Sequence, residues 1–203
     1  MRTEVDILNR YFVSESGENL VEFVYKDLTY YDADNLSQCS LLFLSNIEED
    51  TESRDWRNAV NNCQNSDVVD PKAINFFIYD AWNSDKEFES VRSLGKFNDG
   101  KPYVILDWWR LGHNHQSPEE HEMGHAFGLE HICDPSVTTN DMSSNIMTSA
   151  NKYTDANGNE GDCSDDTNGR GGLRDIGFND EQVDEILRNA VAINYYLNLI
   201  PTP

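Results

Sequence analysis

The stretch SPEEHEMGHAFGLEH, which runs from Ser117 to His131, carries the strongest local pattern in the chain. Ser117 is a preferred N-cap residue, Pro118 suits the first helical position, and Glu120 completes a capping box. Gly128 accepts the left-handed conformation in which many helices end. These signals predict a well-defined helix that begins at Pro118 and ends in a turn at Gly128.

Two histidines and a glutamate lie in the middle of this predicted helix. His121 and His125 are four residues apart, so both imidazoles project from one helix face. That separation allows both rings to bind one zinc ion, with Zn–N distances of about 2.0 to 2.1 Å. Glu122 lies beside the first histidine, where its carboxylate can act as a general base toward water rather than as a ligand.

A third histidine completes the pattern expected of a catalytic zinc site. Such a site takes three protein ligands and leaves one position open. His131 follows His125 by six residues, and a continuous helix would carry it about 9 Å along the axis, away from the metal. A chain reversal at Gly128 brings it back. The alternative interpretation is that these histidines are ordinary surface or core residues.

The run HEMGHAFGLEH at 121–131 resembles the HExxHxxGxxH signature of the metzincin clan of zinc metallopeptidases. That clan also has a methionine in a tight turn beneath the zinc, and the segment NIMT at 145–148 resembles this turn, with Met147 as its methionine. The resemblance implies that His121, His125 and His131 bind the zinc and that Glu122 is the catalytic base.

The resemblance also implies a fold. We expect a single metallopeptidase domain over 1–203 of the mixed α/β or α+β class. Its N-terminal lobe, 1–131, would contain a twisted, mostly parallel sheet, a backing helix and the active-site helix. Its C-terminal lobe, 132–203, would be small and irregular, contain the methionine turn and end in a helix.

The family within the clan stays open. Astacin-like and serralysin-like members place a tyrosine two residues after the turn methionine, where this chain has Ser149, and Tyr153 lies too far along to take that role. The site is therefore more similar to the matrixin, reprolysin or pappalysin type.

The resemblance predicts a zinc-dependent endopeptidase that hydrolyses peptide bonds in protein or peptide substrates. A zinc-bound water, deprotonated by Glu122, would attack the scissile carbonyl. An extended substrate would pair with an edge strand near 91–95, and residues 148–151 would line the pocket on the leaving-group side. Two alternatives remain: a zinc hydrolase of a non-peptide amide or ester, and a secreted binding module with structural zinc.

Hydrophobic patterning predicts the remaining elements. Strands are expected over 19–31, 73–82, 91–94 and 102–109, and helices over 52–64, 118–129 and 180–199. Asn179 would cap the last helix, whose apolar stripe would consist of Val183, Ile186, Leu187, Ala190 and Val191. Residues 151–172 are rich in Gly, Asp and Asn and are expected to form a loop.

The net charge of the chain limits the kinds of molecule that it can bind. The chain has 15 Lys and Arg against 37 Asp and Glu, a formal net charge of −22. This balance opposes binding to nucleic acid, and no apolar run is long enough to span a membrane. We expect a monomer. The first twenty residues lack the pattern of a secretory signal, although Met1 could be the start of a trimmed chain.

Four cysteines, Cys39, Cys63, Cys133 and Cys163, suit two disulfides and therefore a secreted, extracellular or periplasmic location. Of the three possible pairings we favour Cys39–Cys63 with Cys133–Cys163; four buried free thiols are the alternative.

Two weaker features remain open. The segment DANGNEGD at 155–162 offers oxygen ligands for Ca²⁺, but its spacing departs from the EF-hand loop, so a calcium site and a plain acidic loop both remain open. His113 and His115 precede the active-site helix and are interpreted as solvated loop residues rather than as a second metal site.

Overall fold

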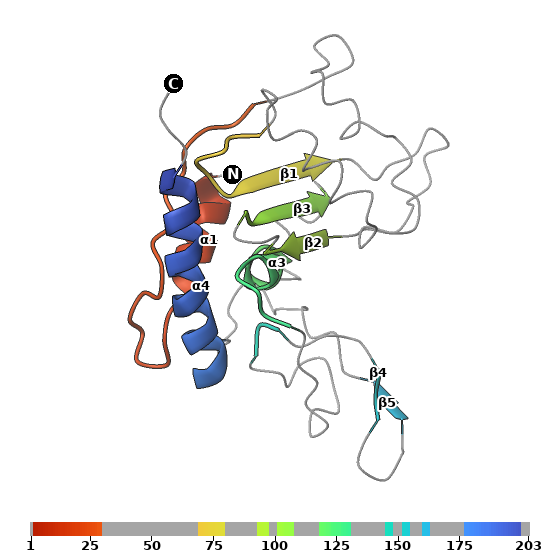
Figure 1. The fold of residues 1–203 in the computed structure, drawn as a ribbon. Helices are drawn as coiled ribbons and strands as arrows, with labels where there is room; N and C mark the ends of the chain where they lie inside the picture. The colour runs from red at the N-terminus through yellow and green to blue at the C-terminus, as the bar shows by residue number, and fades with distance from the viewer. Residues whose placement is uncertain are drawn as a thin grey trace, which may run out of the picture.

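The fold was analysed in a computed structural model. It describes residues 2–29, 69–79, 93–97, 101–107, 118–130, 145–147, 152–154, 160–162 and 177–199. The elements in chain order are α1 (Arg2–Tyr11), β1 (Asn75–Tyr79), β2 (Ser93–Lys96), β3 (Tyr103–Asp107), α3 (Pro118–Ala126), β4 (Lys152–Thr154), β5 (Glu160–Asp162) and α4 (Asp180–Leu199). Helices and strands both contribute, which agrees with the α+β class at a coarse level (Figure 1).

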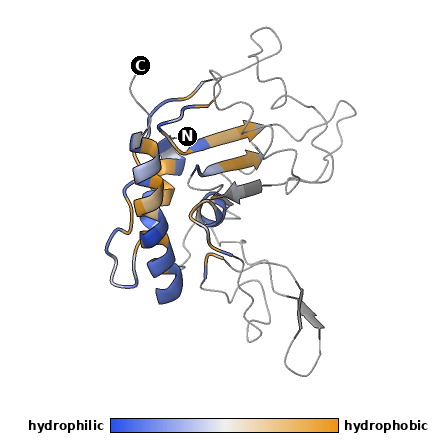
Figure 2. Ribbon diagram, in the orientation of Figure 1, coloured by the Kyte–Doolittle hydropathy of each residue, from blue (hydrophilic) through white to orange (hydrophobic). Residues whose placement is uncertain are grey.

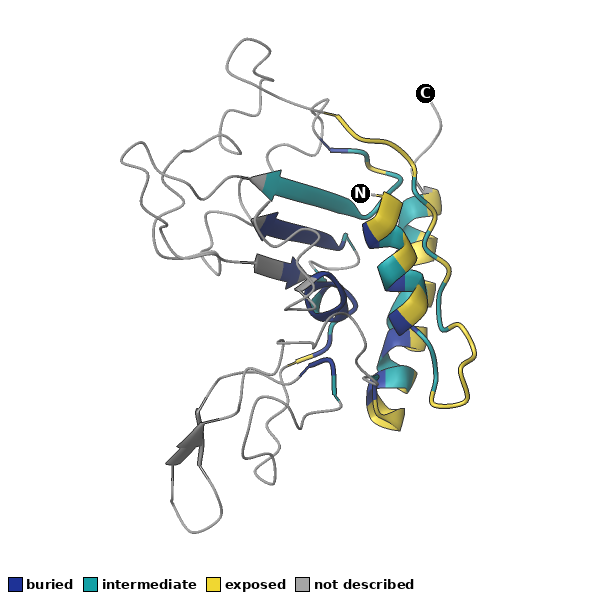
Figure 3. Cartoon of the chain, turned by 180° about the vertical axis from the view of Figure 1, so that it is seen from behind, coloured by how far each residue is buried: buried dark blue, intermediate teal, exposed yellow. Residues whose placement is uncertain are grey.

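The three-stranded sheet has the order β1-β3-β2. β1 and β3 are parallel, with Asn75 opposite Tyr103, whereas β2 runs antiparallel to β3, with Gly95 opposite Val104. The central strand β3 is buried and apolar, as expected for a strand that is covered on both faces (Figures 2 and 3). Among the described strands, β2 lies at the edge beside α3.

α3 packs directly against β2 and β3. The approach to β2 is so close that a Cβ on Gly95 would overlap the backbone carbonyl of Glu122. A glycine is therefore required at this point of the edge strand. α1 packs against α3, and both α1 and α4 lie near the start of β1 and β3 (Figure 1).

An aromatic cluster joins four parts of the chain beneath α3. Phe12, which follows α1, contacts Phe23, Phe127 and Phe178, with ring centroids 5.0 to 5.6 Å apart. Phe127 ends the α3 segment and Phe178 precedes α4. The cluster is part of a single buried core that also contains Leu8, Met123, Met147, Ile186 and Ile193.

The predicted strand over 19–31 is wrong for its described part. Residues 20–29 are extended but have no strand partner, and only an isolated bridge joins Val13 to Asn19. The side chain of Asn9 in α1 takes the place of a neighbouring strand. Its Oδ1 accepts from the Phe23 N–H, and its Nδ2 donates to the Phe23 carbonyl, both at 2.8 Å.

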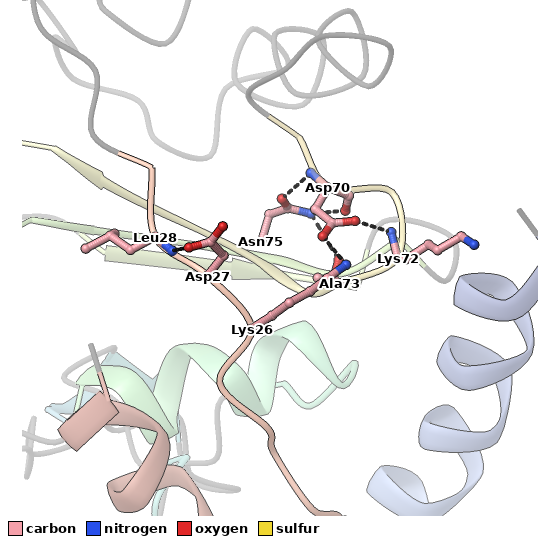
Figure 4. A network of polar contacts seen from close by, with 7 residues as sticks. All are labelled: Lys26, Asp27, Leu28, Asp70, Lys72, Ala73 and Asn75. Carbon is pink, nitrogen blue, oxygen red and sulfur yellow. Dashed lines mark hydrogen bonds and ion pairs between the residues drawn. The ribbon is translucent and has the colours of Figure 1, made fainter. Parts of the chain in front are cut away.

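A polar network fixes the chain where it enters β1 (Figure 4). Asn75 accepts from the Asp70 N–H at 2.8 Å and donates back to the Asp70 carbonyl at 2.9 Å. The Asp70 carboxylate accepts from the Lys72 N–H at 2.8 Å and forms an ion pair with Lys26 of the extended N-terminal segment. This network ties residues 20–29 to the first strand of the sheet.

The other predicted elements have mixed outcomes. The strands predicted over 73–82 and 102–109 contain β1 and β3, the strand predicted over 91–94 overlaps β2 but lies two residues earlier, and the helix over 180–199 is confirmed as α4. The expectation that 151–172 is only a loop is wrong, because β4 and β5 form an antiparallel pair within it. The predicted helix over 52–64 and the lobe boundary after residue 131 lie outside the described residues.

The apolar stripe predicted for α4 needs correction. Leu187 and Val191 are exposed, at 43% and 72%, while Ile186 and Ile193 are buried (Figure 3). Among the described residues, no helix is both long and apolar enough to cross a membrane.

Candidate metal centre

The predicted site residues in α3 lie inside the molecule. The side chains of His121 and Glu122 are 8% and 6% exposed, and His125 is half-buried. α3 begins at Pro118 as predicted, but its regular part ends at Ala126, three residues before the predicted end. α3 is therefore a short, largely buried helix that packs against β2 and β3.

Both histidines are oriented by backbone carbonyls. Nδ1 of His121 lies 2.8 Å from the carbonyl oxygen of Ile146, and Nδ1 of His125 lies 2.6 Å from that of Leu129. A carbonyl oxygen can only accept, so each Nδ1 must hold the proton. In a neutral imidazole with its proton on Nδ1, the Nε2 lone pair is available to a metal ion.

The two Nε2 atoms face each other at 3.2 Å, and the rings are nearly perpendicular, at 86°. If both rings are neutral and carry the proton on Nδ1, both Nε2 lone pairs point to one place, where a single cation could be shared. Two ring nitrogens at this separation are close enough to bind one zinc ion together. This donor pair fits zinc.

The turn after α3 is a complete Schellman motif. Gly128 has φ +92°, its N–H donates to the His125 carbonyl at 2.9 Å, and the Leu129 N–H donates to the Gly124 carbonyl at 3.0 Å. The chain reverses at Gly128, as the proposed return of His131 requires. Because the motif also fixes Leu129, it fixes the carbonyl that orients His125.

Met147 lies buried beneath α3. Its N–H donates to Oδ1 of Asn145 at 2.9 Å, which closes a tight turn. Its sulfur fills the notch left by Gly124, where a Cβ would overlap Sδ. The carbonyl between these two turn residues belongs to Ile146 and is the one that accepts from His121. The turn therefore supports the helix and orients a histidine.

A cluster of buried carboxyl groups, which the sequence analysis did not find, lies at the first turn of α3. Glu119 and Glu120 are 3% and 2% exposed, and Glu4 of α1 is 6% exposed. Burial raises the pKa of Glu119 to about 9, and the hydrogen bond with Glu4 and the charge of Glu120 act in the same direction. The sequence analysis did not predict α1, and the buried residues of this helix include Glu4, so one member of the cluster could not be anticipated.

Several predicted residues lie outside the described part of the chain. These are His113, His115, His131, Cys39, Cys63, Cys133, Cys163, Ser149 and most of the acidic segment 155–162. Within the described residues no group of three metal-binding side chains occurs, which follows because only two of the three predicted ligands are among them. The disulfides, the calcium site and the location outside the cytosol stay predictions.

Comparisons with protein-family models, with curated proteins and with solved structures returned no match.

Proposed function

We propose that this protein is a zinc-dependent endopeptidase of the metzincin type. The observation that carries the proposal is the approach of Nε2 of His121 and Nε2 of His125 to 3.2 Å, with each Nδ1 directed at a backbone carbonyl. This arrangement supports metal binding because the carbonyls occupy both Nδ1 atoms and both Nε2 atoms point to one place, where they could bind a single ion.

Further support for the metzincin type comes from the surroundings of α3. The Schellman turn at Gly128, the buried methionine at 147 against Gly124, and an edge strand beside the helix agree with what the resemblance implies. We propose that the sheet and α3 belong to the N-terminal lobe of such a fold and that the 145–147 turn and α4 belong to the second lobe.

In the proposed reaction His121, His125 and His131 would hold the zinc, which supplies Lewis acidity when bound. Glu122 accepts the proton of the attacking water and then delivers it to the leaving amine. Its place in the helix, next to His121, keeps it beside the reacting groups.

The substrate would lie along β2. Among the described strands β2 is at the edge of the sheet, and it runs across α3 at Gly95 and Glu122. An extended peptide that pairs with this edge would pass close to the segment of α3 that carries Glu122. This arrangement favours a peptide over a small amide or ester, for which a strand edge offers no advantage.

The experiment replaces Glu122 with Gln and measures two quantities, the zinc content and the cleavage of a mixed peptide library. We expect full zinc content and a loss of cleavage of at least about 100-fold, the usual contribution of a general base. The matched control is Glu181→Gln, an exposed glutamate at the start of α4. Normal cleavage by the Glu122 variant would refute the mechanism, and a wild type that cleaves only non-peptide amides or esters would refute the substrate class.

A further inference from the structure

α4 reaches both of the turns that orient the histidines. Gln182 and Asn189 are seven residues apart, so they lie about 20° apart around the helix axis, on one face. Ile186, between them on the same side, is fully buried. Each of the two carboxamides forms a hydrogen bond to a turn that contains one of the carbonyls in contact with an imidazole.

Gln182 acts on the turn that orients His121. Its side-chain Oε1 accepts from Nδ2 of Asn145 at 2.8 Å, and its Nε2 donates back to Oδ1 of Asn145 at 3.2 Å. The same Oδ1 accepts from the Met147 N–H, which shapes the turn and so directs the Ile146 carbonyl toward Nδ1 of His121.

The position of Gln182 is itself fixed by the start of α4. Its Oε1 accepts from the Asn179 N–H at 3.0 Å, and its N–H donates to Oδ1 of Asn179 at 2.9 Å, which is a capping box. Gly177, two residues earlier, accepts from the Ile146 N–H at 3.0 Å. The 145–147 turn is thus held from two directions by the beginning of α4.

Asn189 acts on the turn that orients His125. Its Nδ2 donates to the carbonyl of Phe127 at 2.6 Å, which is one of the carbonyls that the end of α3 leaves without a helical partner. The amide lies so close to Gly128 that a Cβ there would be 2.6 Å from Nδ2. The next residue, Leu129, provides the carbonyl in contact with Nδ1 of His125.

We propose that Gln182 and Asn189 are positioning residues for the metal-binding histidines. Through them, α4 fixes the two carbonyls that hold His121 and His125 in the tautomer and orientation needed for a shared ion. An apolar face would pack α4 against the core equally well, so packing alone gives no reason for two carboxamides at these points. The inference rests on the proposed function for the identity of the ion as zinc.

The test removes each carboxamide with a side chain of similar size, in Asn189→Leu and Gln182→Leu. The control is Asn198→Leu, which removes an exposed carboxamide of α4 whose Nδ2 bonds only within the helix, to Asn194. The main readout is the zinc dissociation constant, measured by competition with a coloured chelator. A second readout is the urea midpoint of the zinc-free protein.

We expect each of the two variants to raise the zinc dissociation constant by about 10- to 100-fold, the usual effect of losing a partner that orients a ligand. The control should change it less than twofold. Because the two residues act on different histidines, the effects of the double variant should multiply. Gln182→Glu keeps the acceptor for the Asn179 N–H and one bond to Asn145, so its effect should be intermediate.

A purely structural role predicts a different result, in which the urea midpoint falls and the zinc dissociation constant stays at the wild-type value. That result overturns the inference. If Asn189→Leu does not fold, Asn189→Asp replaces it in the test. Aspartate has the shape of asparagine but lacks the Nδ2 donor, so zinc binding must weaken by the same amount. Zinc binding that is sensitive to both residues, in a protein without peptidase activity, would refute the proposed function and leave this inference intact. A wild type that binds no zinc would refute both.

Discussion

Gly124→Ala is the substitution that most sharply probes the contact between α3 and the methionine turn. Gly124 lies in α3 between His121 and His125, and replacing glycine by alanine inside a helix ordinarily stabilises a protein by about 0.5 to 1 kcal/mol. Here the added Cβ would overlap Sδ of Met147, and it would lie 3.3 Å from Cε of the same residue and 3.5 Å from Cδ1 of Leu129.

The magnitude follows from two opposing effects. Overfilling a packed core costs about 1 to 3 kcal/mol, and the better helix propensity of alanine offsets up to about 1 kcal/mol of that. We therefore expect the free energy of unfolding to fall by about 1 to 2 kcal/mol. Any shift of Met147 also moves the neighbouring Ile146 carbonyl away from His121, so zinc binding should weaken as well.

The assay is urea unfolding of a double-mutant cycle with Met147→Ala. In the Met147→Ala variant, the methyl group added by Gly124→Ala enters the space that the methionine side chain has left. Gly124→Ala should therefore be neutral or stabilising in that background. The coupling energy between positions 124 and 147 should then be about 1 to 3 kcal/mol. A Gly124→Ala variant that stabilises the protein in the wild-type background would refute the reasoning, because it would mean that Met147 does not lie against the helix.

Two further predictions concern the ends of α3. Gly128→Ala should lower the free energy of unfolding by about 1 to 3 kcal/mol, because φ is +92° and the added Cβ would lie 2.6 Å from Nδ2 of Asn189; Gly128→Asn, which tolerates this φ better, should cost less in the same urea assay. For Glu119, burial raises the folded-state pKa to about 9, so the stabilising contribution is complete below about pH 4.5 and is lost as pH rises toward 9. Urea unfolding of the zinc-free protein should therefore show stability decreasing over this range by up to about 1.4 kcal/mol per pH unit, and Glu119→Gln should reduce the slope; an unchanged slope would contradict the assignment.

The parts of the site that could be predicted from the sequence are those encoded locally. Pro118 and Gly128 marked where α3 begins and reverses, and Asn179 marked the start of α4. Spacing alone placed His121 and His125 on one face. These features depend on residues within one or two turns of each other, which is the range over which caps and helical periodicity act.

The features that were missed depend on contacts between distant parts of the chain. The alternation after Asn19 is real, since residues 21, 23 and 25 are half-buried, but its hydrogen-bond partner is the Asn9 side chain rather than a strand. α1 was not predicted because most of its residues are charged or polar, although its buried residues Glu4, Leu8 and Tyr11 recur at helical spacing. The apolar periodicity of α4 likewise gave no hint that Gln182 and Asn189 share its inner face with Ile186.

The account depends on one claim, that three imidazoles bind a single zinc ion. The most direct measurement is a zinc titration of the wild type and of His121→Ala, His125→Ala and His131→Ala, with stoichiometry determined by metal analysis. The account predicts one zinc per wild-type chain and a large loss of affinity in all three variants. Wild-type affinity in the His131 variant, or no zinc bound by the wild type, would contradict it.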